Sequence, residues 1–503
     1  MPPIDFAVAA GELRERLGGH RVALDDRFLE HLSRACAIVD ASPDSLAESG
    51  RDWWPISLRW ALSGAVPARP GIVARPADTD EVAGVLRCCN EAGIPVTAAG
   101  GRSGVCGGAI PVFGGVSLDC CGLQGLQQVH GDGSLVDVGA GTFGDDLERE
   151  LGSGHGITIG HWPQSVELAT VGGWIACRGA GQYSTRYGKI EDIVAGLEVV
   201  LADGTIVHTG ALAGRGAGPR SAMGPDLTSL FVGSEGTLGV ITAARLRAHP
   251  RATEEQRGAW SFPSFGHGLD ALRRTLRRGA TPAVVRLYDA VESKRHFDTA
   301  DDHVLIALDE GDGVVVDATM RVLAEECRSA ELLDVALVER WFARRNDVSA
   351  LESVTRAGIV VDTIEIAAPW AALTTIYDGA LAGLTGTAGI LAASAHESHA
   401  YLDGACLYFT FAGRGPDPDD DIWAEDFYLR CWQAVLGPTL ANGGSISHHH
   451  GVGLVRGPYL AEALGAGFGV LRQVKEALDP RGILNPGKLG LPSPFGASPW
   501  PGS

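Results

Sequence analysis

Positive charge is scarce in this sequence, and long apolar runs are missing. The chain has 41 Lys and Arg against 61 Asp and Glu, which gives a formal net charge of −20. Because a nucleic-acid surface needs clustered cations, this composition argues against a nucleic-acid partner. No stretch reaches the roughly 18 consecutive apolar residues of a membrane-spanning helix. We therefore expect neither a nucleic-acid partner nor a transmembrane segment.

The cysteines form no recognisable metal or redox motif. None of the ten belongs to a CxxC pair or to a zinc-finger spacing, so they are typical of small buried side chains in a reducing compartment. The first residues, MPPIDFAVAAGELRERLGGH, carry acidic residues where a secretory signal would carry basic ones. These features favour a cytoplasmic protein.

The chain is long enough for several domains. With 503 residues, 45 % of them apolar, it can bury a large core shared by two or three units. We expect an N-terminal helical segment over 1–65, a first domain over 66–248, a second over 249–435, and a C-terminal segment over 436–503 that returns to the first. Within the first segment, helical spacing extends over 11–39, and SPDSLAESGRDWW (42–54) is predicted as a loop.

The first domain opens with a strand, a helix, a strand and a glycine loop. GIVARP and PVTAAGG are predicted strands, and between them lies a predicted helix with Asp78 or Thr79 as its N-cap and Gly93 as its stop. The loop GGRSGVCGG follows, and successive backbone N–H groups of such a loop form an anion nest suited to a pyrophosphate. An ordinary flexible turn is the alternative.

A second glycine pattern is interpreted as accidental. Gly139, Gly141 and Gly144 spell GxGxxG, but the acidic residue that a dinucleotide site needs after the next strand is missing. More informative are Gly172 and Gly173, because a backbone without side chains can approach a flat ligand. The apolar residues around them argue against a solvated loop.

The second half of the chain alternates predicted helices with antiparallel strands, as expected for a sheet covered on one face. Near its end stand three adjacent histidines, His448, His449 and His450. Their internal position excludes an expression tag, and apolar Ile446 and Val452 on either side argue against a solvated loop, the alternative. Histidine titrates near neutrality, so such a cluster could take and return a proton.

Three further residues are candidates for chemistry. Arg286 lies in the apolar strand AVVRL, where a lone guanidinium needs an anion, supplied either by a ligand or by an internal Asp or Glu. Alternation along CLYFTF places Tyr408 on the face opposite Leu407 and Phe409, so its phenol faces a ligand unless it is a core aromatic. His161 is either a general base or a hydrogen-bonded turn residue.

Four stretches, in order, resemble the FAD-binding oxidoreductases of the vanillyl-alcohol oxidase type: PVTAAGGRSGVCGG, PQSVELATVGG, SEGTLGVIT and LDPRGILNPGK. The resemblance implies an α+β fold, with a two-part FAD-binding domain and a cap domain of antiparallel sheet and helices. It also implies FAD, held without a covalent bond, since Cys106 lies near the place where covalent relatives carry a linking histidine. The implied FAD contacts are Ala99, Gly100, Gly101, Arg102, Ser103, Gly104, Val105, Gln164, Ser165, Thr170, Gly172, Gly173, Cys177, Gly179, Glu235, Gly236, Gly239 and Ile241.

Within that type, ITIGHWPQSVELATVGGW, RYGKIEDIV, PAVVRLYD, DGACLYFTF and NGGSISHHHGVG resemble the alkyldihydroxyacetonephosphate synthases. This resemblance implies exchange of an acyl for an alkyl group through an adduct at the flavin N5, on a small phosphate- or carboxylate-bearing substrate. It also implies the catalytic residues His161, Arg286, Arg356, Tyr408, His448, His449 and His450. We further expect a homodimer.

Related 2-hydroxyacid dehydrogenases are similar to this chain but carry HxGDGNxH and a Glu-His pair, which bind a divalent metal. Here the corresponding stretches are HAYLDGACLY and HHHG, so we expect no metal of that kind. An FAD-linked dehydrogenase or oxidase of a 2-hydroxy acid remains the alternative function, with Arg286 holding a carboxylate. A non-catalytic FAD-holding protein is a third interpretation, which the intact histidines, Tyr408 and Arg286 oppose.

Overall fold

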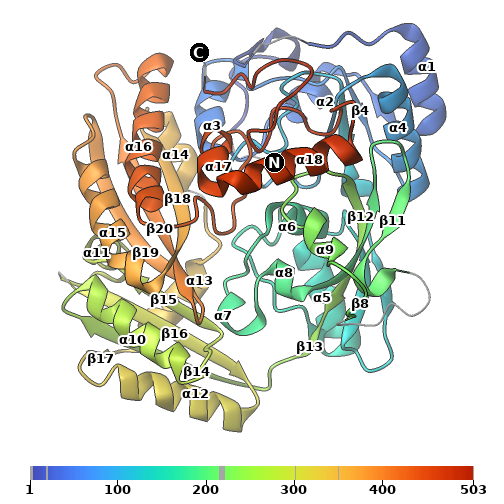
Figure 1. Ribbon diagram of the computed structural model, residues 1–503. Helices are drawn as coiled ribbons and strands as arrows, with labels where there is room; N and C mark the ends of the chain where they lie inside the picture. Colours follow the sequence, from blue (N-terminus) through green and yellow to red (C-terminus); the bar gives the residue numbers. More distant parts are fainter. Residues whose placement is uncertain (1–3, 18–20, 214–220, 301, 349, 502–503) are drawn as a thin grey trace.

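The structure of the protein is a computed structural model that describes residues 4–17, 21–213, 221–300, 302–348 and 350–501. Within these residues the strands form a four-stranded, a five-stranded and a seven-stranded sheet, besides two pairs of short strands. Figure 1 shows the seven-stranded sheet and its helices (yellow to orange) on one side and the first domain (blue to green) on the other. The mixed helix and sheet architecture agrees with the predicted α+β class.

The four-stranded sheet contains the predicted strand, helix, strand and glycine loop. Its order is β2 (Val39–Asp40), β4 (Ile72–Ala74), β6 (Val116–Asp119), β5 (Val96–Ala99), and the last three strands are parallel. The helix α4 (Thr79–Ala92) begins where the Asp78 side chain accepts the Glu81 N–H, and it ends at Gly93 in the left-handed conformation. The helix therefore has the caps that the sequence predicts.

The N-terminal segment differs from the helical segment expected over 1–65. The predicted helix over 11–39 reduces to α1 (Asp26–Ala35), and β1 (Arg14–Glu15) pairs in parallel with β3 (Ala65–Val66). The predicted loop contains α2 (Pro43–Glu48), because Ser42 caps it and Pro43 suits the first helical turn. The remaining elements are the 3-10 turn Ala10–Glu12 and α3 (Pro55–Leu62).

The five-stranded antiparallel sheet completes the first domain. Its order is β11 (Ile206–His208), β10 (Val194–Val200), β12 (Val240–Arg247), β8 (Leu135–Gly139), β7 (Leu126–Val129). Because both neighbours of β8 are antiparallel, the GxGxxG after it does not belong to a parallel βαβ unit. The other elements are α5 (Gly144–His155), β9 (Ile157–Thr158), α6 (Val171–Cys177), α7 (Ser184–Tyr187), α8 (Ile190–Ile193), α9 (Leu227–Phe231), β13 (His249–Pro250) and the 3-10 turns Cys120–Gly122 and Gly210–Leu212.

The second domain, called the cap below, is built on the seven-stranded antiparallel sheet. Its order is β17 (Glu331–Leu333), β14 (Glu254–Phe262), β16 (His303–Gly311), β15 (Val284–Tyr288), β19 (Ile390–Ala400), β20 (Gly404–Gly413), β18 (Val360–Pro369). Its helices are α10 (Phe265–Arg277), α11 (Ala290–Phe297), α12 (Gly313–Glu326), α13 (Ala336–Arg344), α14 (Ala350–Arg356), α15 (Trp370–Thr385) and α16 (Asp421–Ala441). Since α16 continues to residue 441, the boundary predicted at 435 falls inside a helix and is wrong.

The C-terminal segment contains α17 (Gly457–Leu464) and α18 (Ala466–Leu478), which lie beside the first domain in Figure 1. Val474 and Leu478 pack against the core of the five-stranded sheet. Lys475 of α18 joins the C-terminal segment to the first domain, because its ammonium donates to the carbonyl oxygen of Thr237. The same ammonium donates to the carbonyl oxygen of Leu484 and to the carboxylate of Asp479. Farther along, Trp500 packs edge-on against Trp54. In the described part of the chain no helix has both the length and the hydropathy that a membrane crossing requires.

The buried Lys475–Asp479 pair predicts a large loss of stability in Asp479→Asn. The side chains of the pair are 9 % and 0 % exposed, and burial lowers the pKa of Lys475, so the ammonium depends on its carboxylate. Removing one partner of such a pair costs about 3 kcal/mol. Thermal unfolding should show a clearly lower midpoint. The control Glu476→Gln, which breaks the exposed pair with Arg472, should cost under about 1 kcal/mol; equal effects would contradict the prediction.

Candidate active site

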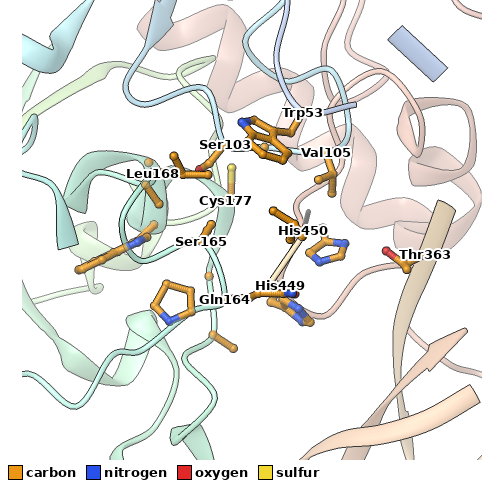
Figure 2. A pocket seen from close by; sticks show the side chains of 18 of the residues that line it. Trp53, Ser103, Val105, Gln164, Ser165, Leu168, Cys177, Thr363, His449 and His450 are labelled. Atoms are coloured by element: carbon orange, nitrogen blue, oxygen red, sulfur yellow. The ribbon is translucent and has the colours of Figure 1, made fainter. Parts of the chain in front are cut away.

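A cavity of about 960 Å³ lies between the first domain and the cap. The structure places all of the residues predicted to contact FAD along its wall, from Ala99 to Ile241. Of the predicted catalytic residues, Arg286, Tyr408, His449 and His450 also line it, whereas His161, Arg356 and His448 do not. Figure 2 shows His449 and His450 between the loop that carries Gln164 and Ser165 and the cap strand that carries Thr363.

The glycines of the loop after β5 serve two different purposes. A Cβ on Gly101 would lie 1.8 Å from the carbonyl oxygen of Leu168, and one on Gly100 would lie 2.2 Å from the Thr170 hydroxyl. These two glycines therefore let two loops of the cavity wall meet. Gly104 differs, because a Cβ there would meet no protein atom within 4 Å although the residue lines the cavity.

One buried carboxylate positions the histidine loop. Glu365 on β18 is fully buried and accepts the backbone N–H groups of His448 and His450, as well as the Ser447 hydroxyl at 3.0 Å. Arg456 donates to the same carboxylate at 3.0 Å. Burial alone would raise the pKa of Glu365, but the charge of Arg456 and the backbone hydrogen bond from His448 lower it to about 2. An ionised carboxylate thus joins the cap strand to the loop.

A second carboxylate holds the other end of the same loop. Glu235, one of the predicted FAD contacts, accepts the backbone N–H groups of Val452 at 2.5 Å and Gly453 at 2.8 Å. The Asn485 side chain, in the LNPGK stretch, donates to the Glu235 carbonyl oxygen at 2.7 Å and to that of Gly108 at 3.0 Å. The C-terminal motif therefore ties the histidine loop to the glycine-rich wall.

The three histidines face in different directions. His449 and His450 line the cavity, while His448 turns away from it and stacks on His399 at 5.0 Å between ring centroids. Burial lowers the pKa of all three, to about 4 for His450, and the pKa is lowered further by neighbouring histidines at His448 and His449 and by Arg456 at His450. The expectation that they titrate near neutrality is therefore wrong, since the surroundings keep the rings neutral. Neutral imidazoles can accept a proton at neutral pH.

Tyr408 occupies the face that alternation predicts. Leu407 and Phe409 are fully buried in the sheet, whereas Tyr408 lines the cavity. Its hydroxyl oxygen accepts the Thr363 hydroxyl at 2.9 Å, and its ring stacks on His396 at 4.9 Å. Burial raises the pKa of Tyr408 well above its ordinary value. The phenol therefore stays protonated beside the cavity.

Arg286 has no carboxylate of the described residues within ion-pair distance. Its Nε donates to the Tyr288 hydroxyl at 3.0 Å, and its Nη2 donates to His396 Nε2 at 2.7 Å. Its guanidinium lies 5.7 Å from the Trp341 ring centroid. The structure therefore does not show the internal acidic partner that the sequence left open as an alternative. The Arg286 guanidinium keeps N–H donors for a ligand in the cavity.

His161 lies outside the cavity, contrary to its predicted catalytic place. Its ring is fully buried and packs on Trp174 at 4.6 Å, and it is Trp174 that lines the cavity. Burial lowers the pKa of His161 to about 3, and neither ring nitrogen has a hydrogen-bond partner in the described part of the chain. The left-handed turn at Gly160 directs the chain into the core here.

Arg356, another predicted catalytic residue, also lies outside the cavity wall. It lies on α14 with its side chain half exposed and pairs with Glu352 at 2.9 Å, one helical turn away. The cap arginines that do line the cavity, besides Arg286, come from α11 and the end of α13: Arg295, Arg340, Arg344 and Arg345. These arginines were not predicted because the sequence pattern did not reveal α11 or α13 as elements.

Helices α13 and α14 supply much of the apolar wall of the cavity. The cavity-lining apolar residues of the cap are Phe297, Trp341, Val348, Leu351, Val354 and Val361. They line the same cavity as the arginines of α13, so this wall suits an amphiphilic ligand with an anionic group. The spacing of Trp341, Arg344, Arg345 and Val348 is the signal that could have revealed a cavity-facing helix.

His399, His448 and His449 form a cluster that could hold a metal ion. One ring nitrogen from each lies within 4.8 Å of the others, and the His399 ring lies 5.0 Å from both of the other two rings, measured between centroids. His399 donates or accepts one hydrogen bond with the Ser184 hydroxyl at 2.8 Å. The expected lack of a metal therefore stays a prediction.

Comparison with known proteins identifies the family. The family described as FAD binding domain matches residues 70–210, and the family described as FAD linked oxidases, C-terminal domain, matches residues 251–489. The FAD-linked oxidoreductase YgcU of Escherichia coli K12 is 30 % identical, over 84 % of this chain and 89 % of that protein. This chain belongs to the FAD-linked oxidoreductase family. FAD is therefore its cofactor, as the sequence predicts.

Other relatives of this FAD-linked oxidoreductase include two different kinds of protein. Alkyldihydroxyacetonephosphate synthase of Trypanosoma brucei brucei is 27 % identical, over 98 % of this chain and 82 % of that protein. Glycolate oxidase subunit GlcD of Bacillus subtilis is 29 % identical, over 84 % and 89 % respectively. The family thus spans a synthase and an oxidase.

Solved structures confirm the predicted fold. A structure of alkyldihydroxyacetonephosphate synthase has a TM-score of 0.76 at 23 % identity, and covers 96 % of this chain and 89 % of that chain. p-Cresol methylhydroxylase has a TM-score of 0.74 at 17 % identity, with 93 % and 96 % covered. The FAD-linked oxidoreductase therefore has the two-part FAD-binding domain and the cap expected from the resemblance.

The residues present fit FAD. The wall of the first domain is built from loops 99–105 and 164–170, whose glycines leave backbone next to open space at Gly104. Such a wall would hold the dinucleotide through backbone N–H groups, without a charged side chain. Tyr408 of the cap, and His449 and His450 of the C-terminal segment, would then face the ring of the cofactor.

Substitution of two glycines of one loop, Gly104 and Gly101, separates contact with FAD from protein packing. Gly104→Ala adds a Cβ that meets no protein atom, so the apoprotein should keep its thermal midpoint while FAD binds about tenfold more weakly. Gly101→Ala instead clashes with Leu168 and should lower the midpoint of the apoprotein as well. Fluorescence titration of the apoprotein with FAD measures the affinity. Unchanged FAD affinity in Gly104→Ala would show that the cofactor does not contact this loop.

Proposed function

We propose that the enzyme exchanges the acyl group of an acyl-dihydroxyacetone phosphate for an alkyl group, as an alkyldihydroxyacetonephosphate synthase does. The observation that carries this proposal is that Arg286, Tyr408, His449 and His450 line one cavity together with the FAD-binding loops. The apolar wall of α13 and α14 adds a surface for long hydrocarbon chains. The relatives that carry this name support the same reaction.

Bound FAD would supply an electrophilic centre for the substrate carbon at C1. Arg286 would bind the phosphate, because it is a guanidinium without an acidic partner among the described residues. A neutral imidazole would take a proton from C1 and return it to the same carbon before the ether product leaves. His449 suits this step in the tautomer whose Nδ1–H donates to His448 Nδ1, at 2.9 Å, because its Nε2 is then an acceptor.

Tyr408 would move the second proton. Its raised pKa keeps the phenol protonated, so it can donate to the departing fatty acid carboxylate and then take the proton of the incoming fatty alcohol. The Thr363 hydroxyl, which donates to the phenol oxygen at 2.9 Å, holds this group in place. His161 has no role in these steps because it lies behind Trp174.

The reaction can be tested directly with the purified holoenzyme. Incubation with palmitoyl-dihydroxyacetone phosphate and labelled hexadecanol should yield labelled ether product and one equivalent of free palmitate, with no net reduction of the flavin. A preparation that contains FAD but forms no ether product would contradict the proposal.

Oxidation of a 2-hydroxy acid is the second candidate function. The metal-type cluster of His399, His448 and His449 favours it, as does the similarity to glycolate oxidase subunit GlcD. In that reaction Arg286 would bind the carboxylate and a neutral histidine would take the hydroxyl proton. Anaerobic addition of glycolate or D-lactate would then bleach the visible flavin band, whereas the synthase reaction leaves that band intact.

Tyr408→Phe should lower turnover by about a hundredfold with the FAD content unchanged, since it removes only the proton-transfer group. Steady-state assays and the flavin absorbance of the purified variant measure the two effects. Tyr377→Phe, on α15 and outside the cavity wall, is the matched control and should turn over normally. Full activity in Tyr408→Phe would rule out the role given to this residue.

A further inference from the structure

We propose that Glu292 and His396 are positioning residues that aim one edge of the Arg286 guanidinium at an oxyanion of the substrate. The inference rests on the proposed function only in taking Arg286 as the anion-binding group. Glu292 lies on α11 and His396 on β19, and both side chains are buried beside the cavity. Neither belongs to a motif that the sequence analysis singled out.

The hydrogen bonds that join Glu292, His396 and Arg286 determine the tautomer of His396. The Glu292 carboxylate lies 2.7 Å from His396 Nδ1, and Arg286 Nη2 lies 2.7 Å from His396 Nε2. A carboxylate only accepts and a guanidinium only donates. His396 is therefore neutral, with its proton on Nδ1 directed at Glu292 and its Nε2 lone pair directed at Arg286.

This arrangement leaves one defined edge of Arg286 free for a ligand. Of the five N–H donors of a guanidinium, Nε–H is used by the Tyr288 hydroxyl and one Nη2–H by His396. The remaining donors are the second Nη2–H and both Nη1–H groups. Nη1 and Nη2 together can make two parallel hydrogen bonds to a phosphate or a carboxylate. The side edge, Nε with Nη2, is closed to a ligand.

The surroundings hold both positioning residues rigidly. His396 stacks between Tyr288, at 5.2 Å, and Tyr408, at 4.9 Å. Glu292 Oε1 accepts the hydroxyl groups of Ser394 and Thr410, each at 3.0 Å. Burial alone would raise the pKa of Glu292, but His396 and then Arg295 lower it to about 2. The same imidazole thus contacts the anion-binding arginine and the catalytic tyrosine.

Two substitutions of His396 separate the hydrogen bond from the packing. His396→Phe keeps a ring between the two tyrosines but removes the acceptor for Arg286. His396→Gln gives up the ring but places a side-chain carbonyl oxygen close to the position of Nε2. If the imidazole acts by positioning Arg286, the glutamine variant should bind anions better than the phenylalanine variant, whereas a packing role predicts the reverse order.

The binding experiment uses the FAD-loaded enzyme and two simple probes, inorganic phosphate and oxalate, titrated by calorimetry. We expect His396→Phe to weaken binding of the preferred anion at least about tenfold, the weight of one charge-assisted hydrogen bond, and His396→Gln to recover affinity to within about threefold. His267→Phe, at an exposed position on α10, is the control and should bind like the wild type. Preference for phosphate or for oxalate distinguishes a phosphomonoester from a carboxylate substrate.

A spectroscopic measurement tests the tautomer without any ligand. In holoenzyme labelled with ¹⁵N-histidine, the His396 signal, assigned by its loss in His396→Gln, should show a protonated Nδ1 and an unprotonated Nε2 at neutral pH. A proton on Nε2 would overturn the proposal. So would unchanged anion affinity in His396→Phe, or a wild-type enzyme that binds neither anion.

The two proposals fail separately. A holoenzyme that binds phosphate through Arg286 but forms no ether product contradicts the proposed reaction and leaves the positioning role intact. An active synthase whose anion affinity does not respond to His396 contradicts the positioning role alone.

Discussion

The buried carboxylate of Glu365 is the contact on which the candidate site depends. It is ionised, fully buried, and accepts hydrogen bonds from the backbone of His448 and His450 and from Arg456. A buried charge is tolerated only where such partners compensate it, so the cap strand, the histidine loop and Arg456 are stabilised together. Glu235 fixes the other end of the loop from the first domain. The histidines therefore occupy a defined place only when both domains and the C-terminal segment are assembled.

The two domains divide the chemistry between them. The first domain contributes backbone and glycine, which suit a large cofactor, and the cap and the C-terminal segment contribute the ionisable groups. Burial keeps His449 and His450 neutral and Tyr408 protonated. The cavity therefore holds proton acceptors and a proton donor side by side, with Arg286 as an anion-binding cation. Either of the two candidate reactions could use this set, and the substrate would decide which of them occurs.

Local signals in the sequence predict much of this structure, whereas contacts between residues far apart in the sequence could not be predicted. The caps of α4 and the face of Tyr408 follow from residues close in sequence. The strand β19 was missed because its small and polar residues do not alternate clearly, and with it His396. Its partner Glu292 lies over a hundred residues away. Such a pair becomes visible only when the sheet order is known. The resemblance implies Arg356 as a catalytic residue, but the structure shows cavity-lining arginines on α13 instead.

The central claim is that FAD and the substrate share the cavity between the glycine loops and the cap. A crystal structure of the FAD-loaded enzyme tests it most directly. The account predicts the dinucleotide part of FAD along loops 99–105 and 164–170, with Tyr408 and His449 on the substrate side of its isoalloxazine ring. A flavin ring bound outside this cavity, or turned so that neither side chain faces it, would contradict the account.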